Sequence, residues 1–117
     1  MLTQEAGVVI GVDTHKYTHT AAAVSATGAV LDQLTVAADR AGYRRLIDFG
    51  RGHSAGLWAI EGTGSFGAGL TSALLSVGEH VVEVDRPERP ARRAGVKSDD
   101  IDAVRAARQA LAGIGVA

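Results

Sequence analysis

Residues 8–16 read Val8-Val9-Ile10-Gly11-Val12-Asp13-Thr14-His15-Lys16. The run before Asp13 is almost continuously apolar, which is typical of a central strand covered on both faces. Open α/β sheets place their functional groups at the carboxyl ends of such strands. We therefore predict a buried strand over residues 7–13 that presents one carboxylate, Asp13. Taken alone, Asp13 is equally compatible with an acid that only caps a turn.

The rest of the chain alternates between short apolar runs and segments with helical spacing. Further strands are predicted over 18–25, 29–36, 57–60 and 81–84. Helices are predicted to start at three places with capping residues, which are Asp39, then Thr63 or Ser65, then Ser98 or Asp99. The middle helix should turn apolar side chains inward, namely Phe66, Leu70, Leu74 and Leu75, and stop at Gly78.

The predicted order, β-β-β-α-β-α-β-α, indicates an α/β fold with one mixed five-stranded sheet. An antiparallel meander comes first, parallel βα units follow, and helices cover both faces. This topology places the first strand beside the fourth. The length of 117 residues fits a single domain over residues 1–117.

Composition excludes several classes of protein. A hydrophobic content of 46% argues against disorder, and the absence of cysteine excludes disulfides and thiolate metal sites. No apolar stretch is long enough to span a membrane, and residues 1–7 do not resemble a signal peptide, so we expect a cytoplasmic protein. The net charge of −1 does not by itself indicate a nucleic-acid-binding protein. A basic run over residues 86–97 can neutralise phosphates, or it can be a solvated loop.

Two further places supply acids that could join Asp13. Glu61 follows the apolar run 57–60, at the end of the strand predicted to lie beside the first. Asp99 and Asp102 are spaced i, i+3 on one helix face, above the small residues Ala103, Ala106 and Ala110. Four carboxylates in one place would suit a hard cation such as Mg²⁺ or Mn²⁺. For the helical pair the alternative is plain, since acids in a first turn also complement the helix dipole.

Other residues near these strand ends have two readings each. His15 and Lys16 could contact a phosphate beside the metal, or could simply be solvated. The glycine-rich run 62–67 could cradle a phosphate at a helix start, or could serve close strand-to-helix packing. It lacks the ending of a P-loop.

Three motifs together resemble a known family. They are Gly11-Val12-Asp13-Thr14-His15-Lys16, Trp58-Ala59-Ile60-Glu61-Gly62-Thr63-Gly64-Ser65-Phe66-Gly67, and Arg92-Arg93 followed by Lys97-Ser98-Asp99-Asp100-Ile101-Asp102-Ala103. This set resembles the N-terminal domain of DEDD-type insertion-sequence transposases, which are RNA-guided recombinases. The resemblance covers nearly the whole chain and implies a ribonuclease-H-like (RuvC-like) fold.

The resemblance also implies a function and a site. Asp13, Glu61, Asp99 and Asp102 would be the catalytic tetrad, holding Mg²⁺ (or Mn²⁺) for phosphodiester cleavage and strand transfer in DNA transposition. Candidate nucleic-acid contacts are His15, Lys16, Arg86, Arg92, Arg93 and Lys97. The family further implies DNA and a guide RNA as partners, homo-oligomers, and a C-terminal serine domain that we expect this chain to lack.

The sequence departs from the family at three positions, Tyr17, Asp85 and Asp100, none of which belongs to the tetrad. Three other readings stay open. The chain could be an inactive transposase remnant that only binds nucleic acid, a stand-alone junction resolvase, or one half of an actin-like ATPase. Metal-dependent nicking of branched DNA would separate the resolvase from the remnant, and nucleotide titration would identify the ATPase.

Overall fold

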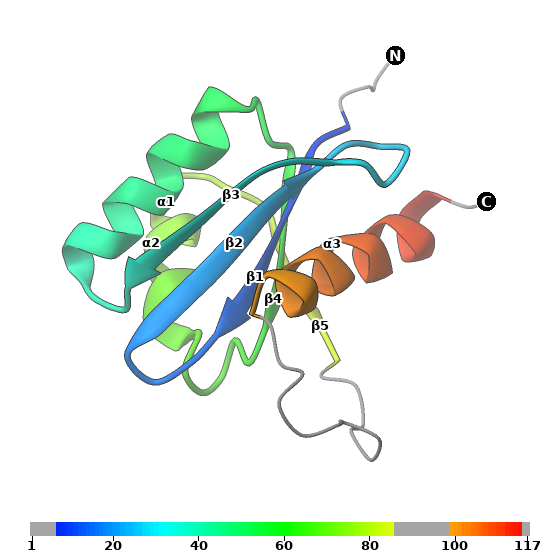
Figure 1. Ribbon diagram of the computed structural model, residues 1–117. Coiled ribbons are helices and arrows are strands. Elements are labelled where there is room, and N and C mark those ends of the chain that lie inside the picture. The colour runs from blue at the N-terminus through cyan, green and yellow to red at the C-terminus, as the bar shows by residue number, and fades with distance from the viewer. Residues whose placement is uncertain (1–6, 86–98, 116–117) are drawn as a thin grey trace.

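The computed structural model describes residues 7–85 and 99–115, without the side chains of residues 99, 100, 114 and 115. Five strands make up its sheet, namely β1 (Val9–Thr14), β2 (Thr18–Val24), β3 (Val30–Ala37), β4 (Leu57–Glu61) and β5 (Val81–Val84). Their order across the sheet is β3-β2-β1-β4-β5 (Figure 1). The first three strands pair antiparallel, while β1 pairs parallel with β4 and β4 with β5. The predicted meander, the parallel half and the adjacency of β1 and β4 are confirmed.

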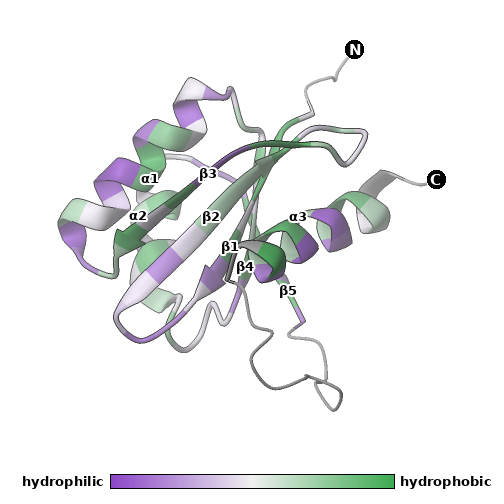
Figure 2. Ribbon diagram, viewed as in Figure 1, coloured by the Kyte–Doolittle hydropathy of each residue, from purple (hydrophilic) through white to green (hydrophobic). Residues whose placement is uncertain are grey.

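Helices cover both faces of the sheet, as predicted. One face carries α1 (Arg40–Gly52) and α2 (Ala68–Ser76), and the other carries α3 (Asp99–Gly115) (Figure 1). The side chain of Asp39 caps α1 by accepting a 2.8 Å hydrogen bond from the Gly42 N–H. Hydrophilic and hydrophobic residues alternate along α1 in Figure 2, as expected for a helix with one face on the sheet.

The predicted start of the second helix is wrong. It begins at Ala68 with Gly67 at the N-cap and no side-chain cap, because residues 62–67 first form a tight turn. Gly62 has φ +75°, and its carbonyl oxygen accepts from the N–H groups of Ser65 (3.0 Å) and Gly67 (2.8 Å). The prediction of Thr63 or Ser65 as a cap therefore fails.

The late start of α2 also changes which of its side chains are inside. Leu70 and Leu74 are fully buried, as predicted. Phe66 and Leu75 are 52% and 57% exposed, so their predicted inward orientation is wrong. Phe66 precedes the helix, and a nine-residue helix turns only a narrow i, i+4 stripe toward the sheet.

The two layers have different packing. Large side chains form the core on the face of the sheet that α1 and α2 cover. They include Ile10, Leu46, Trp58 and Leu70. Beneath α3 the buried side chains are mainly Ala and Val. Small side chains let a helix axis come close to a sheet, so α3 lies nearer to β1 than a helix with large residues could. Within the described residues, no helix is both long and apolar enough to cross a membrane.

Candidate active site

Asp13 and Glu61 lie on the face of the sheet that α3 covers. A Cβ at Gly11 would meet Ala103 and Ala107 of α3, so Gly11 faces that helix. Asp13, two residues further along β1, faces the same way. The parallel register pairs Val12 with Ile60, and one further step places Asp13 beside Glu61. The structure therefore brings these two predicted site residues together at the carboxyl ends of neighbouring strands.

Both carboxylates are almost fully buried. The exposed fraction is 1% for Asp13 and 2% for Glu61. Asp13 Oδ2 lies 2.8 Å from His15 Nε2. The side chain of His15 is 42% exposed. Thr14 Oγ1 donates to the Glu61 carbonyl oxygen at 2.9 Å and ties the two strand ends together. His15, predicted as a phosphate contact, thus lies directly against Asp13, and its contact with a phosphate stays a prediction.

The helix that carries the other two acids, α3, packs on the same face of the sheet as this pair. Its first turn lies toward the carboxyl end of β1 (Figure 1). Asp102 is on α3 with its side chain 21% exposed, and its Oδ1 is 3.4 Å from Arg105 Nη1. Asp99 is the first residue of α3, and its side chain lies outside the described residues. The predicted contact face of α3 is right for Ala103 and Ala106, which are buried, and Ala110 is half-buried.

Sequence reasoning missed Ala107, which is fully buried and lies against Gly11. The signal was present, because Ala107 is four residues beyond Ala103 and so shares its helix face.

The described residues include no group of three acid, histidine or cysteine side chains close enough to hold a metal ion. The donors that are in place are two buried carboxylates on adjacent strands, an all-oxygen pair of the kind that Mg²⁺ and Mn²⁺ prefer. They fit part of a divalent-metal site, and α3, which begins at Asp99, packs against the same face of the sheet. The predicted tetrad stays a prediction. Arg86, Arg92, Arg93 and Lys97 lie outside the described residues.

The glycine-rich turn between β4 and α2 serves close packing. A Cβ at Gly67 would lie 2.9 Å from the Gly62 carbonyl oxygen and 3.1 Å from Thr14 Cγ2. Thr63 Oγ1 donates to Glu83 Oε1 at 2.6 Å, which anchors the turn to β5. Of the two readings of this run, packing is the one that the contacts support.

Two threonines, Thr20 and Thr35, lie in line with the two acids on the neighbouring strands β2 and β3. Sequence reasoning missed them. Thr20 is the cross-strand partner of Asp13, and Thr35 is the partner of Thr20. The two hydroxyl oxygens lie 2.9 Å apart. Because paired residues share a face of the sheet, Glu61, Asp13, Thr20 and Thr35 form one polar row on the α3 side. The period of two along each strand was visible in the sequence, but the register that aligns them was not.

His19 belongs to the opposite face and to the core. Its side chain is fully buried, and its ring stacks on Tyr43 with centroids 6.0 Å apart. Burial lowers the pKa of His19 below its usual value, opposed by the hydrogen bond at 3.0 Å between Nδ1 and the Thr18 carbonyl oxygen. We therefore assign His19 a structural role.

Comparison with known proteins points in one direction. A family model of IS110-type DEDD transposases, described as a transposase, matches residues 10–114. No protein with a curated description matches the chain. The fold is similar to that of a Fowlpox virus resolvase in complex with Holliday junction DNA, with a TM-score of 0.66 at 8% identity over 93% of this chain and 99% of that one. It is equally similar to T. thermophilus RuvC in complex with a Holliday junction substrate, with a TM-score of 0.66 at 16% identity over 95% and 98% of the two chains.

Proposed function

This chain belongs to the DEDD transposase family, and from that premise we propose that it is a divalent-metal-dependent nuclease domain that cuts DNA strands during transposition. Its ribonuclease-H-like fold is that of the two junction resolvases. The proposed ligands of Mg²⁺ or Mn²⁺ are the tetrad Asp13, Glu61, Asp99 and Asp102. The proposed substrate is DNA, with branched DNA as the first form to test because both resolvases are bound to Holliday junctions.

The observation that carries the proposal is the burial of two carboxylates side by side. Asp13 and Glu61 are each at least 98% buried and share a face at the ends of paired strands. Adjacent strands are about 4.8 Å apart, so the two carboxylates lie within reach of one bound cation. Such a cation would favour the ionised form of both acids, and their oxygen atoms are the ligands that Mg²⁺ and Mn²⁺ prefer.

Each residue of the site has a distinct proposed task. Asp13 and Glu61 hold the cation from the sheet, while Asp99 and Asp102 complete its ligands from α3. His15, 2.8 Å from Asp13 Oδ2, fixes the orientation of that carboxylate. A metal bound here would polarise the phosphodiester and lower the pKa of an attacking water. A guide RNA and a dimeric or tetrameric assembly are further parts of this proposal, supported by the family resemblance alone.

Metal binding is tested first by thermal and urea unfolding of the 117-residue chain in EDTA and in excess MgCl₂ or MnCl₂. A cation at about 100 times its Kd raises the free energy of unfolding by about 2.7 kcal/mol. Glu61→Gln should abolish this rise, because it removes one of the two sheet carboxylates that are proposed to hold the cation. Asp48→Asn, at an exposed position on α1, is the matched control and should keep the metal effect.

Cleavage is tested separately, with a labelled four-way DNA junction. We expect Mg²⁺-dependent nicking that is lost in Glu61→Gln and kept in Asp48→Asn. Metal-dependent stabilisation that survives Glu61→Gln would contradict the assigned site. If the chain binds metal but nicks neither junction nor duplex DNA, it is a metal-binding domain, and the proposal that it acts alone as a nuclease is refuted.

A further inference from the structure

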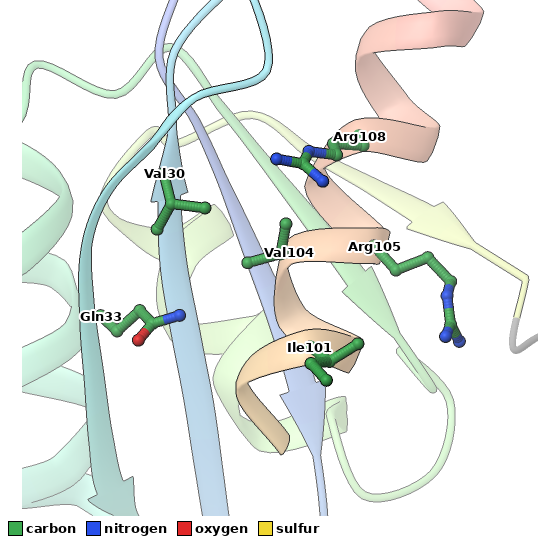
Figure 3. Close-up of a pocket in the computed structure, with 6 residues that line it drawn as sticks. All are labelled: Val30, Gln33, Ile101, Val104, Arg105 and Arg108. Atoms are coloured by element: carbon green, nitrogen blue, oxygen red, sulfur yellow. The ribbon is translucent and has the colours of Figure 1, made fainter. Parts of the chain in front are cut away.

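A groove lies beside the polar row, between the edge strand β3 and α3. Six residues line a cavity of about 360 Å³, namely Val30, Gln33, Ile101, Val104, Arg105 and Arg108. Figure 3 shows Val30 and Gln33 extending from β3 toward α3, with Val104 between the two elements. The groove exists because α3 packs chiefly on β1 and β2, so the part of the sheet face contributed by β3 is left open.

The groove lies on the face of the sheet that carries the candidate active site. Gln33 pairs with Ala22, which is buried under α3, so Gln33 shares the face of Asp13. Thr35, two residues along β3, is paired with Thr20, and Thr20 with Asp13. Two strand spacings separate Thr35 from Asp13, which is about 10 Å. Thr20, between them, is buried, so the groove and the acids are neighbours on one face of the sheet.

The side chains of the groove combine apolar surface with positive charge. Val30 and Ile101 are 44% and 56% exposed, so the groove presents apolar surface to the solvent. Arg105 and Arg108 supply two guanidinium groups, and none of the six lining residues is acidic. Gln33 adds an amide that can both donate and accept hydrogen bonds.

The two arginines differ in how they are held. Arg108 donates from Nε and Nη2 to the Gly28 carbonyl oxygen, at 3.0 and 2.7 Å, which leaves other guanidinium N–H groups for a ligand. Arg105 pairs with Asp102 at 3.4 Å, so its partner is one of the proposed metal ligands.

We propose that this groove binds single-stranded DNA flanking the phosphate that is cut, with its phosphates on Arg105 and Arg108 and a base or sugar against Val30 and Ile101. The inference rests on the proposed function, since it takes the strand beside the cut phosphate to lie on the face of the sheet that carries Asp13. Alternating apolar and anionic parts are the chemistry of a nucleic-acid strand, and the absence of an acid among the lining residues matches it. The position of the groove on the same sheet face as the acids favours the substrate DNA over an RNA.

The test is the binding of a fluorescein-labelled single-stranded DNA, measured by anisotropy in EDTA with the 117-residue chain. Gln33→Glu places a carboxylate in the groove at nearly constant shape and should weaken binding about tenfold, which is about 1.4 kcal/mol. Gln109→Glu is the matched control, because Gln109 is exposed on α3 and does not line the groove. It should bind within about twofold of the parent chain, since an added charge outside the contact acts only through screened long-range repulsion.

A second pair of variants tests the phosphate contact. Arg105→Gln should reduce the slope of log K against log salt by about 0.7, the value for one phosphate contact on a single strand. Arg44→Gln, an exposed arginine on α1, should leave the slope unchanged. Circular dichroism of each variant checks that the fold is intact.

Several outcomes would overturn the groove proposal. Equal losses in Gln33→Glu and Gln109→Glu would show that only net charge matters. Tighter binding of RNA than of DNA of the same sequence would refute DNA as the occupant, and no binding at low salt would refute the site. Because the assay contains EDTA, it is independent of the metal. Loss of Mg²⁺ stabilisation in Glu61→Gln together with unchanged DNA binding in Gln33→Glu would refute the groove and leave the proposed function standing.

Discussion

Gly11→Ala tests whether α3 must lie against β1 for this fold to be stable. The new Cβ would collide with the Ala103 carbonyl oxygen and lie 2.6 Å from the Ala107 backbone nitrogen and 2.9 Å from the Ala107 Cβ. The first two of these atoms belong to the helix backbone and cannot rotate away, so either α3 or β1 must shift. Overpacking of a core usually costs 1–3 kcal/mol, and a backbone obstacle puts this case at the upper end, about 3 kcal/mol.

Urea and thermal unfolding measure this loss directly. For a domain of this size, about 3 kcal/mol corresponds to a fall in Tm of about 10 °C. Gly56→Ala is the matched control, because a Cβ there meets nothing within 4 Å and the backbone conformation suits an L side chain. Its stability should stay within about 0.5 kcal/mol of the parent chain. Equal stability of the two variants would refute the close approach of α3 to β1.

Three further predictions concern stability alone, measured by urea unfolding. Asp39→Ala removes the side-chain cap of α1 and should cost about 1 kcal/mol; an unchanged midpoint would contradict the cap. Thr14→Val leaves the Glu61 carbonyl oxygen without its hydroxyl donor and should cost 1–3 kcal/mol at about constant side-chain volume, whereas a gain would show that this bond does not tie the strand ends. Burial keeps the pKa of His19 below its usual 6.5, so the unfolded chain binds the proton more readily, and stability should fall as pH drops below about 6.5. His19→Phe should lose that part of the pH dependence, and an unaltered pH profile would contradict the assignment.

The sheet could be predicted from the sequence because its strands have strong local patterns. Continuous apolar runs marked β1 and β4 as central, and the handedness of βα connections left little choice but to place them side by side. That adjacency brought Asp13 and Glu61 together without any knowledge of side-chain positions. The Asp39 cap was predictable for the same reason, since capping depends on residues only three apart.

The start of α2 could not be predicted, because it depends on a tight turn. Thr63 and Ser65 are good N-caps by residue type, but the positive φ of Gly62 folds the chain back on itself before a helix can begin. The exposure of Phe66 follows from that turn. Thr63 and Ser65 have the residue types of helix caps, but the helix begins later than they suggest. The turn that delays it packs against Thr14, which is far away in the sequence.

The polar row shows a different limit. Thr20 and Thr35 are ordinary strand residues in the sequence, and only the cross-strand register places them in line with Asp13. Register is set by the whole hydrophobic face, so it is a collective property of the sheet. The contact between His15 and Asp13 is equally invisible, since it requires the geometry of the chain at the end of β1.

Small residues determine where the acids of α3 can lie. Asp13 and Glu61 are placed together by the pairing of β1 with β4, whereas the distance of Asp102 from them depends on the spacing between α3 and the sheet. That spacing is set by Gly11 on the strand and by Ala103 and Ala107 on the helix, none of which has a polar side chain. A larger residue at any of the three positions would move α3 outward as one body. We therefore expect Gly11→Ala to weaken Mg²⁺ binding as well as folding, whereas Glu61→Gln should remove Mg²⁺ binding directly, by removing a ligand. Loss of stability in Gly11→Ala with unchanged Mg²⁺ affinity would show that the metal is held by the sheet acids without α3.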